Sequence, residues 1–201
     1  MVNEGQIHKL LKEYFQIDGD YSLDEQGKVG VDGSVKLIRV VNKLPVRFGE
    51  IGGDFICEGN HLTTLENAPG SVRGRFNCHD NEITSLVGAP TRVGWVFDCS
   101  YNKLTSLKGA PKSVEYEFVC NRNPLVSLEG APEGTDTIFI CDYNNQLPLL
   151  RLINYDTVEF INDVPLKVYE ILKKYSGQGK KGAIKAAAEL IKAGYKDNAR
   201  W

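Results

Sequence analysis

The chain has 201 residues, of which 42% are hydrophobic and 25% are charged, a composition typical of one folded domain or a short repeat array. Its formal net charge of -2 argues against the basic surface of a non-specific nucleic-acid-binding protein, so we expect no nucleic-acid partner. The N-terminus lacks the apolar core of a signal peptide, and no segment approaches the roughly 20 apolar residues of a membrane span. We therefore expect a cytoplasmic protein with no membrane partner.

The first 20 residues are predicted to form an N-terminal capping helix. Apolar residues recur there at the spacing of one helix face: Ile7, Leu10, Leu11, Tyr14 and Phe15. Asn3 and Gln6 resemble a capping box in front of this stripe.

From about residue 55 the chain repeats every 21 residues. Three residue types keep this period through five units: Phe55, Phe76, Phe97, Phe118 and Phe139; Cys57, Cys78, Cys99, Cys120 and Cys141; Asn60, Asn81, Asn102, Asn123 and Asn144. Four prolines follow it too: Pro69, Pro90, Pro111 and Pro132. A fixed period of this length predicts a stack of equal structural units, with function on a surface rather than in one catalytic pocket.

One repeat can be interpreted residue by residue. Phe97 and Cys99 are two residues apart, so they share the inner face of an extended strand. Asn102 marks the following corner, where its amide can bond turn backbone, and stacked copies would form a ladder. Pro111 favours an extended return path, because it removes a donor and restricts the residue before it. Each unit should be one short parallel strand plus an extended return segment.

This pattern matches the leucine-rich repeat, with Phe and Cys in the two strand positions. We predict a leucine-rich-repeat solenoid over residues 21–163, with degenerate units at both ends. Val35 and Leu37 alternate as a first, atypical strand. Phe160 lies 21 residues after Phe139 and predicts a last strand at 158–160 in the same register.

Residues 164–201 are predicted to form a C-terminal cap of two helices, since open repeat stacks need covered ends. The two apolar stripes expected to face the core are Val168, Ile171, Leu172 and Tyr175, and Ile184, Ala187, Ala188 and Ile191. An alternative is that this helix pair also docks a partner.

Two local motifs have simpler explanations than a functional site. The cysteines could bind metal with neighbouring histidines (Cys57, His61, Cys78 and His79), but adjacent strand residues point to opposite faces, so we expect buried, reduced thiols. Residues 177–182 spell GxGxxG, but a dinucleotide loop follows a strand, whereas a helix is expected here. We expect a turn between the two helices, and no metal, cofactor or catalytic residue.

The variable outward positions of the strands are the candidate interface. In the last three repeats they gather apolar and aromatic residues: Val96, Tyr101, Val119, Ile138, Ile140 and Tyr143. Such residues on a rigid sheet are typical of a protein-binding hot spot. The alternatives are that β-branched residues simply favour strands, or that the C-terminal helices fold over this surface.

The repeats resemble two known groups. The run Asn102–Leu107, followed by Pro111, is similar to the short repeats of secreted bacterial effectors such as YopM and the IpaH ubiquitin ligases. From about residue 31 to the C-terminus the chain more closely resembles leucine-rich-repeat proteins of tailed bacteriophages, which carry F-x-C-x-x-N-x-L-T-S-L-x-G-A/C-P-x-x-V and a helical tail like residues 190–201. That resemblance implies a viral, intracellular protein and no defined activity. The effector ligases attach a separate catalytic domain, whereas the short segment after Asp163 contains no Cys.

These observations predict a non-catalytic protein-protein interaction module of phage origin, which binds a host or viral protein through its repeat face in the host cytoplasm. A virion structural or assembly component is the alternative. An effector-type enzyme that lacks its catalytic domain is a third.

Overall fold

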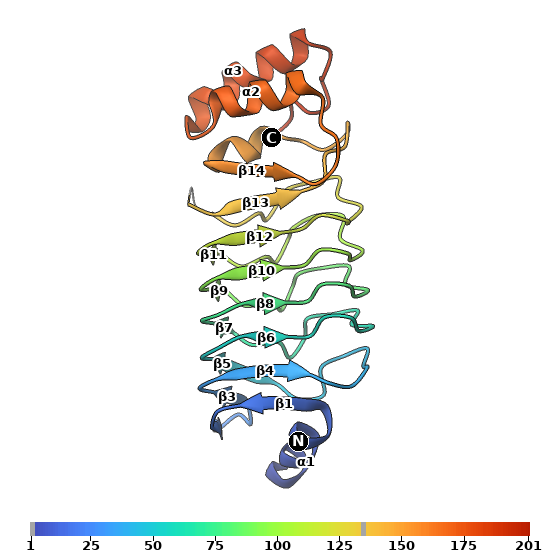
Figure 1. The fold of residues 1–201 in the computed structure, drawn as a ribbon, viewed down its shortest axis with the longest axis vertical. Coiled ribbons are helices and arrows are strands. Elements are labelled where there is room, and N and C mark those ends of the chain that lie inside the picture. The colour runs from blue at the N-terminus through green and yellow to red at the C-terminus, as the bar shows by residue number, and fades with distance from the viewer. Residues whose placement is uncertain (1–2, 134–135) are drawn as a thin grey trace.

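The computed structural model describes residues 3–133 and 136–201, which form a β-solenoid with helices at both ends (Figure 1). Successive coils stack along one axis, so that equivalent residues of neighbouring repeats lie side by side. The helical elements are α1 (Glu4–Tyr14), the 3-10 helix η1 (Leu150–Asn154), α2 (Leu166–Tyr175) and α3 (Gly179–Lys192).

The main sheet has eight strands and follows the repeat order. In spatial order they are β1 (Phe15–Asp18), β4 (Ser34–Leu37), β6 (Phe55–Ile56), β8 (Phe76–Asn77), β10 (Val96–Asp98), β12 (Glu117–Val119), β13 (Ile138–Cys141) and β14 (Thr157–Phe160). All neighbours pair in parallel except β1, which is antiparallel to β4. The predicted short parallel strands are therefore confirmed.

The return segments form a second sheet that the sequence analysis did not foresee. Its strands, in spatial order, are β11 (Ser113–Val114), β9 (Arg92–Val93), β7 (Ser71–Val72), β5 (Phe48–Ile51), β3 (Val29–Val31) and β2 (Tyr21–Leu23). The return path is extended, as predicted, and tight. Gly109 has a φ of 88°, and a Cβ there would lie 2.4 Å from the backbone nitrogen of Val87, so Gly109 leaves no room for a side chain. Asn67 holds the equivalent position of the first regular repeat, also with a positive φ of 74°.

The core consists of stacked columns of identical side chains. The Phe rings of β6, β8, β10, β12 and β13 lie 5.3 to 5.6 Å apart between centroids and are fully buried. The five cysteines form a second buried column, with every thiol free. Repeated leucines, among them Leu104 and Leu107, fill the opposite wall. Each repeat buries its apolar face against its neighbours, so contacts between adjacent repeats stabilise the stack.

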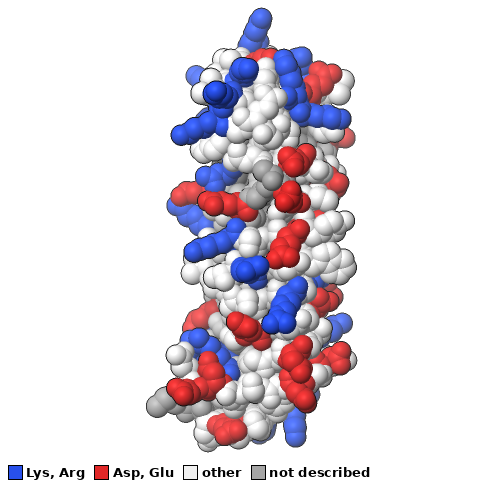
Figure 2. Space-filling model, turned by 90° about the vertical axis from the view of Figure 1, so that its left-hand side faces the viewer, with Lys and Arg blue, Asp and Glu red and all other residues white. Residues whose placement is uncertain are grey.

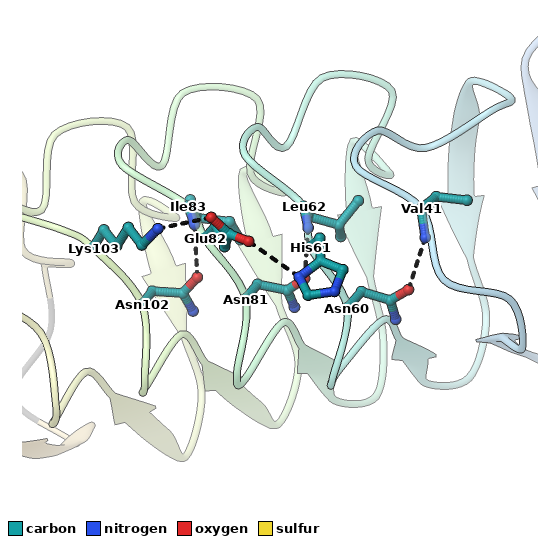
Figure 3. Close-up of polar contacts among 9 residues, drawn as sticks. All are labelled: Val41, Asn60, His61, Leu62, Asn81, Glu82, Ile83, Asn102 and Lys103. Carbon is teal, nitrogen blue, oxygen red and sulfur yellow. Dashed lines mark hydrogen bonds and ion pairs between the residues drawn. The ribbon is translucent and has the colours of Figure 1, made fainter.

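The predicted asparagine ladder is present at Asn60, Asn81, Asn102 and Asn123 (Figure 3). Asn144 departs from it, since its Nδ2 donates to the Leu125 carbonyl and its Oδ1 accepts from the Gln146 N–H. The Oδ1 of Asn102 accepts a bond of 2.9 Å from the Ile83 N–H of the preceding coil. Its Nδ2 donates to the carbonyls of Cys78 and Cys99, at 3.0 and 3.1 Å. Asn81 and Asn123 make equivalent bonds. Each amide thus bridges two coils and pairs backbone groups that lack ladder partners.

The N-terminal end is built differently from the prediction in one respect. The capping box between Asn3 and Gln6 is present, but α1 ends at Tyr14, and Phe15 begins β1 instead of extending the helix. Phe15 is buried and packs edge-on against Phe48, 5.1 Å between centroids. A helix ending at Tyr14 lets residues 15–18 form a strand that pairs with β4 and closes the sheet edge.

At the C-terminal end the last strand exists, but its expected register is wrong. Phe139 pairs with Val158, and Phe160 pairs with Cys141, so the spacing shortens to 19 residues. The aromatic column is continued instead by Tyr155, whose ring centroid lies 4.8 Å from that of Phe139 and whose hydroxyl donates to the Pro132 carbonyl at 2.5 Å. The η1 turn before Tyr155 replaces the regular return path and resets the phase.

The α3 stripe predicted to face the core is wrong for Ile184, Ala188 and Ile191, whereas Ala187 packs against the core and is partly buried. The helix buries Gly182, Ala183, Ala186 and Leu190, whereas Ile184 and Ile191 face outward. Small residues on the inner face let α3 approach α2 and η1 closely, which outweighs the burial of the larger isoleucines. In the part of the chain that the structure describes, no helix is long and apolar enough to span a bilayer.

Candidate interaction surface

The outer face of the main sheet displays two rows of side chains, because alternate strand residues point away from the core. In one row Glu117 lies between Val96 and Ile138, its register partners on the two neighbouring strands. In the other row Val119 and Ile140 are direct partners. The predicted candidates therefore do not form one continuous patch.

The structure brings Val119, Ile138 and Ile140 together on β12 and β13, where all three side chains are half-buried. Val96 is buried and is separated from them by Glu117. The acidic partners around this apolar cluster are Asp98, Glu117 and Glu159. We call these six residues, without Val96, the sheet patch: Asp98, Glu117, Val119, Ile138, Ile140 and Glu159.

Tyr143 is partly covered by the C-terminal segment. Its hydroxyl donates to Oδ1 of Asn198 at 3.1 Å, and burial raises the pKa of this phenol. Asn198 is itself buried and donates to the carbonyls of Asn144 and Leu147 at 3.0 and 2.8 Å. Tyr143 therefore helps to attach the residues after α3 to the solenoid.

Tyr101 has an unusual backbone conformation. Its φ is +54°, in the left-handed region that L-residues other than glycine rarely adopt. Asp80 and Arg122 occupy the same position of neighbouring repeats with φ of 53° and 57°. Gly59 fills this position in the first regular repeat, with φ of 63°. Glycine would satisfy the backbone at every one of these corners, so the side chains at Tyr101 and Arg122 are retained at a cost in stability.

The Tyr101 ring is exposed to 49% and held by its neighbours. The His79 ring lies edge-on at 4.9 Å between centroids, and the Arg122 guanidinium carbon lies 6.0 Å from the Tyr101 centroid. Contacts on two sides reduce the rotamer entropy that Tyr101 would lose on binding. An exposed, pre-oriented tyrosine is a typical anchor of protein interfaces.

A second aromatic pair lies at the strand entry. Trp95 and Tyr116 are about half-exposed, with centroids 6.4 Å apart. The Arg75 guanidinium lies 5.3 Å from the Trp95 centroid. These residues lie between the strands of the two sheets, just before β10 and β12, whereas Tyr101 follows the other end of β10.

His79, Ser100 and Asp98 are close enough to suggest a catalytic triad, but they are connected in the wrong order. The Ser100 hydroxyl donates to Asp98 Oδ1 at 2.5 Å, and His79 Nδ1 lies 2.9 Å from the same hydroxyl. In a triad the histidine stands between serine and carboxylate and accepts the serine proton. Here the proton of a buried serine is directed to Asp98, which also accepts from the Ser100 N–H at 2.9 Å. The cluster stabilises the turn after β10.

The cysteines and the glycine-rich turn show no arrangement for chemistry. Burial raises the pKa of all five thiols, so they stay protonated and unreactive at neutral pH. Across residues 3–133 and 136–201, no three His, Cys, Asp or Glu side chains converge on a metal site. His61 instead lies 3.1 Å from Glu82 in an exposed ion-pair row that also includes Lys103 (Figure 3). The GxGxxG run lies only in part in the expected turn between α2 and α3, because Gly179–Gly182 already form the first turn of α3.

The left-handed backbone at Asp80, Tyr101 and Arg122 was not predicted from the sequence. A signal for it was present, because Gly59 stands one residue before its ladder asparagine, Asn60, as Tyr101 stands before Asn102. Glycine readily adopts a positive φ, so Gly59 hints at a left-handed corner that the other repeats share.

No family model, curated protein or solved structure matches the chain. The functional argument therefore depends on the geometry of the molecule itself.

Proposed function

We propose that the chain is a non-catalytic protein-binding module, which holds its partner on the outer face of the main sheet and on the adjacent Tyr101 corner. The observation that carries this proposal is Tyr101: an exposed aromatic ring, kept at a φ of +54° where glycine would be less strained, and held between His79 and Arg122. Backbone strain that the fold does not need is typical of functional positions.

The chemistry of the sheet patch favours one kind of partner. Its half-buried apolar centre, Val119, Ile138 and Ile140, adjoins the carboxylates of Asp98, Glu117 and Glu159. A partner segment with apolar side chains flanked by Lys or Arg would bury the centre and pair with the acidic residues. The rigid sheet requires little ordering on binding, which improves affinity.

We also propose that the solenoid is of the leucine-rich-repeat type. The Asn ladder and the buried leucines of each coil support a leucine-rich-repeat solenoid, with α1 and the α2–α3 pair as its end caps. Five free, buried thiols fit a reducing compartment. Together with the resemblance of the repeat unit, they support a phage protein that acts in the cytoplasm of its bacterial host.

The test is affinity capture of partners from infected-cell lysate with three forms of the full chain. Ile138→Thr/Ile140→Thr removes apolar area from the sheet patch but keeps β-branching, and Val87→Ser/Val126→Ser changes two exposed valines on the return segments. We expect one protein to be retained by the wild type and the valine variant and lost from the isoleucine variant. Equal recovery by all three would refute the sheet patch as the binding site.

A further inference from the structure

The small net charge of the chain conceals a separation of charge along the solenoid. Residues 164–201 contain nine Lys and Arg against three Asp and Glu, whereas residues 1–163 contain fifteen against twenty-three. Figure 2 shows basic side chains gathered around the C-terminal end of the molecule, whereas acidic and basic side chains are interspersed on the face below. One end of the molecule is therefore basic and the rest is acidic.

The basic end also exposes large apolar side chains. Because α3 buries its small residues, Ile184 and Ile191 point outward and are 70% and 54% exposed. Trp201 is 55% exposed and lines, with Leu150 and Ile184, an almost wholly apolar hollow of about 400 Å³. Leaving these side chains in water has a cost that burial against a partner would remove.

Four exposed lysines lie on the same helix as these apolar residues: Lys180, Lys181, Lys185 and Lys192. The acidic residue of α3, Glu189, is already occupied by Lys174 and by the Tyr175 hydroxyl, both at 2.6 Å. No ion pair to a carboxylate is formed by any of the four lysines within the described residues. Their charges are therefore free to meet an external anion.

We propose that the outer face of α3, together with Trp201, docks the molecule end-on to an anionic lipid bilayer surface. Isoleucine and tryptophan side chains would enter the interface between headgroups and acyl chains, while the flexible lysines contact anionic headgroups. The combination favours a bilayer over nucleic acid, because nucleic-acid phosphates would pair with the lysines but would bury little of the exposed isoleucines. The occupant also needs no shaped groove, which matches the outward-facing helix.

Residues 1–163, which are acidic overall, are not strongly repelled by the anionic bilayer when only the basic C-terminal end contacts it. The main sheet has eight strands at about 4.8 Å spacing, so it extends roughly 30 Å along the axis from the C-terminal helices. The Debye length at physiological salt is about 8 Å, so most of the acidic residues are screened from the membrane. The expectation of no membrane partner came from the lack of a signal peptide and of a spanning segment, and neither bears on a localised surface patch.

The experiment is co-sedimentation of the full chain with vesicles of phosphatidylcholine alone and of phosphatidylcholine with 30% phosphatidylglycerol, as a salt series. We expect binding only to the anionic vesicles, weakening as salt rises. Lys181→Glu/Lys185→Glu should lower the partition coefficient at least about thirtyfold. Ile184→Ser/Ile191→Ser should lower it about tenfold. Far-UV circular dichroism melts check that each variant is folded.

Matched controls place the same changes elsewhere. Lys9→Glu/Lys112→Glu alters net charge equally, and Val87→Ser/Val126→Ser removes slightly smaller apolar side chains that are exposed to nearly the same fraction as Ile184 and Ile191; both should bind like the wild type. No preference for anionic vesicles, or equal loss in test and control variants, overturns the proposal. Binding to duplex DNA that needs the lysines but not the isoleucines, without vesicle binding, would assign the patch to a polyanion. Self-association lost in Ile184→Ser/Ile191→Ser, without vesicle binding, would assign it to a second copy.

Discussion

The strained corner at Tyr101 makes an unusual prediction about stability. Tyr101→Gly and Tyr101→Ala remove the same half-exposed ring and its contacts with His79 and Arg122. The left-handed conformation costs an L-residue about 1–2 kcal/mol, because its Cβ is crowded by the backbone. The alanine variant keeps this Cβ at a φ of +54°, whereas the glycine variant has none and is not strained. We expect the glycine variant to be more stable than the alanine variant by about 1 kcal/mol, the reverse of the usual order.

Gly59 provides the reciprocal control. Its φ is 63°, and no heavy atom lies within 4 Å of the place a Cβ would take, so only the backbone conformation opposes a larger residue. Gly59→Ala should therefore lose about 1 kcal/mol. Urea unfolding followed by circular dichroism measures all three free energies. An alanine variant of Tyr101 as stable as the glycine variant would show that this corner stores no strain, and the functional argument built on it would fail.

Three further predictions concern the core. Asn102→Ala should lower the free energy of unfolding in urea by about 3 kcal/mol, because the Ile83 N–H and two buried carbonyls lose their partner. The control is Asn144→Ala, which should lose less, because Asn144 is half-buried and lies outside the regular ladder. Equal losses in the two variants would contradict the role of the ladder. Burial raises the pKa of the five thiols, so their contribution to stability is complete below about pH 8.5. At higher pH the thiols of the unfolded chain ionise, and the free energy of unfolding should fall by up to about 1.4 kcal/mol per thiol per pH unit. Urea unfolding measured at alkaline pH tests this, and a free energy that stays constant to pH 10 would refute it. Cys99→Ser should destabilise the protein less than Cys57→Ser, because the Cys99 thiol already donates to the Val119 carbonyl at 3.3 Å and a hydroxyl could keep this bond. Differential scanning calorimetry should therefore give Cys99→Ser the higher melting temperature of the two.

Much of the solenoid could be predicted because its repeat signals are local and redundant. Phe97, Cys99 and Asn102 recur at one spacing, and each has one structural role that the period repeats. The strands, the buried thiols and the Asn ladder all follow from that spacing.

The ends could not be predicted as well, because there the outcome depends on packing between elements that sequence periodicity does not describe. Phe160 keeps the 21-residue period but does not lie beside Phe139; it pairs with Cys141, because η1 shortens the last coil. Tyr155 continues the aromatic column instead. In α3 the apolar stripe of Ile184 and Ile191 was the stronger sequence pattern, yet close contact through small residues determined which face was buried.

The candidate surface was predicted in composition but not in arrangement. The outward positions of Val119, Ile138 and Ile140 followed from strand alternation. That Glu117 separates Val96 from this cluster, and that Asn198 engages Tyr143, depends on register and on contacts between residues far apart in the chain.

The most direct test of the proposed function is the affinity of the captured partner for Tyr101→Gly, measured by isothermal titration calorimetry beside the wild type and Val87→Ser/Val126→Ser. A circular dichroism melt of Tyr101→Gly checks that the variant is folded, so that a loss of binding can be assigned to the missing ring. We expect the wild type and the valine control to bind equally and Tyr101→Gly to lose about 2 kcal/mol, roughly thirtyfold in Kd. An unchanged Kd for Tyr101→Gly would contradict the assignment of this corner as the interaction site.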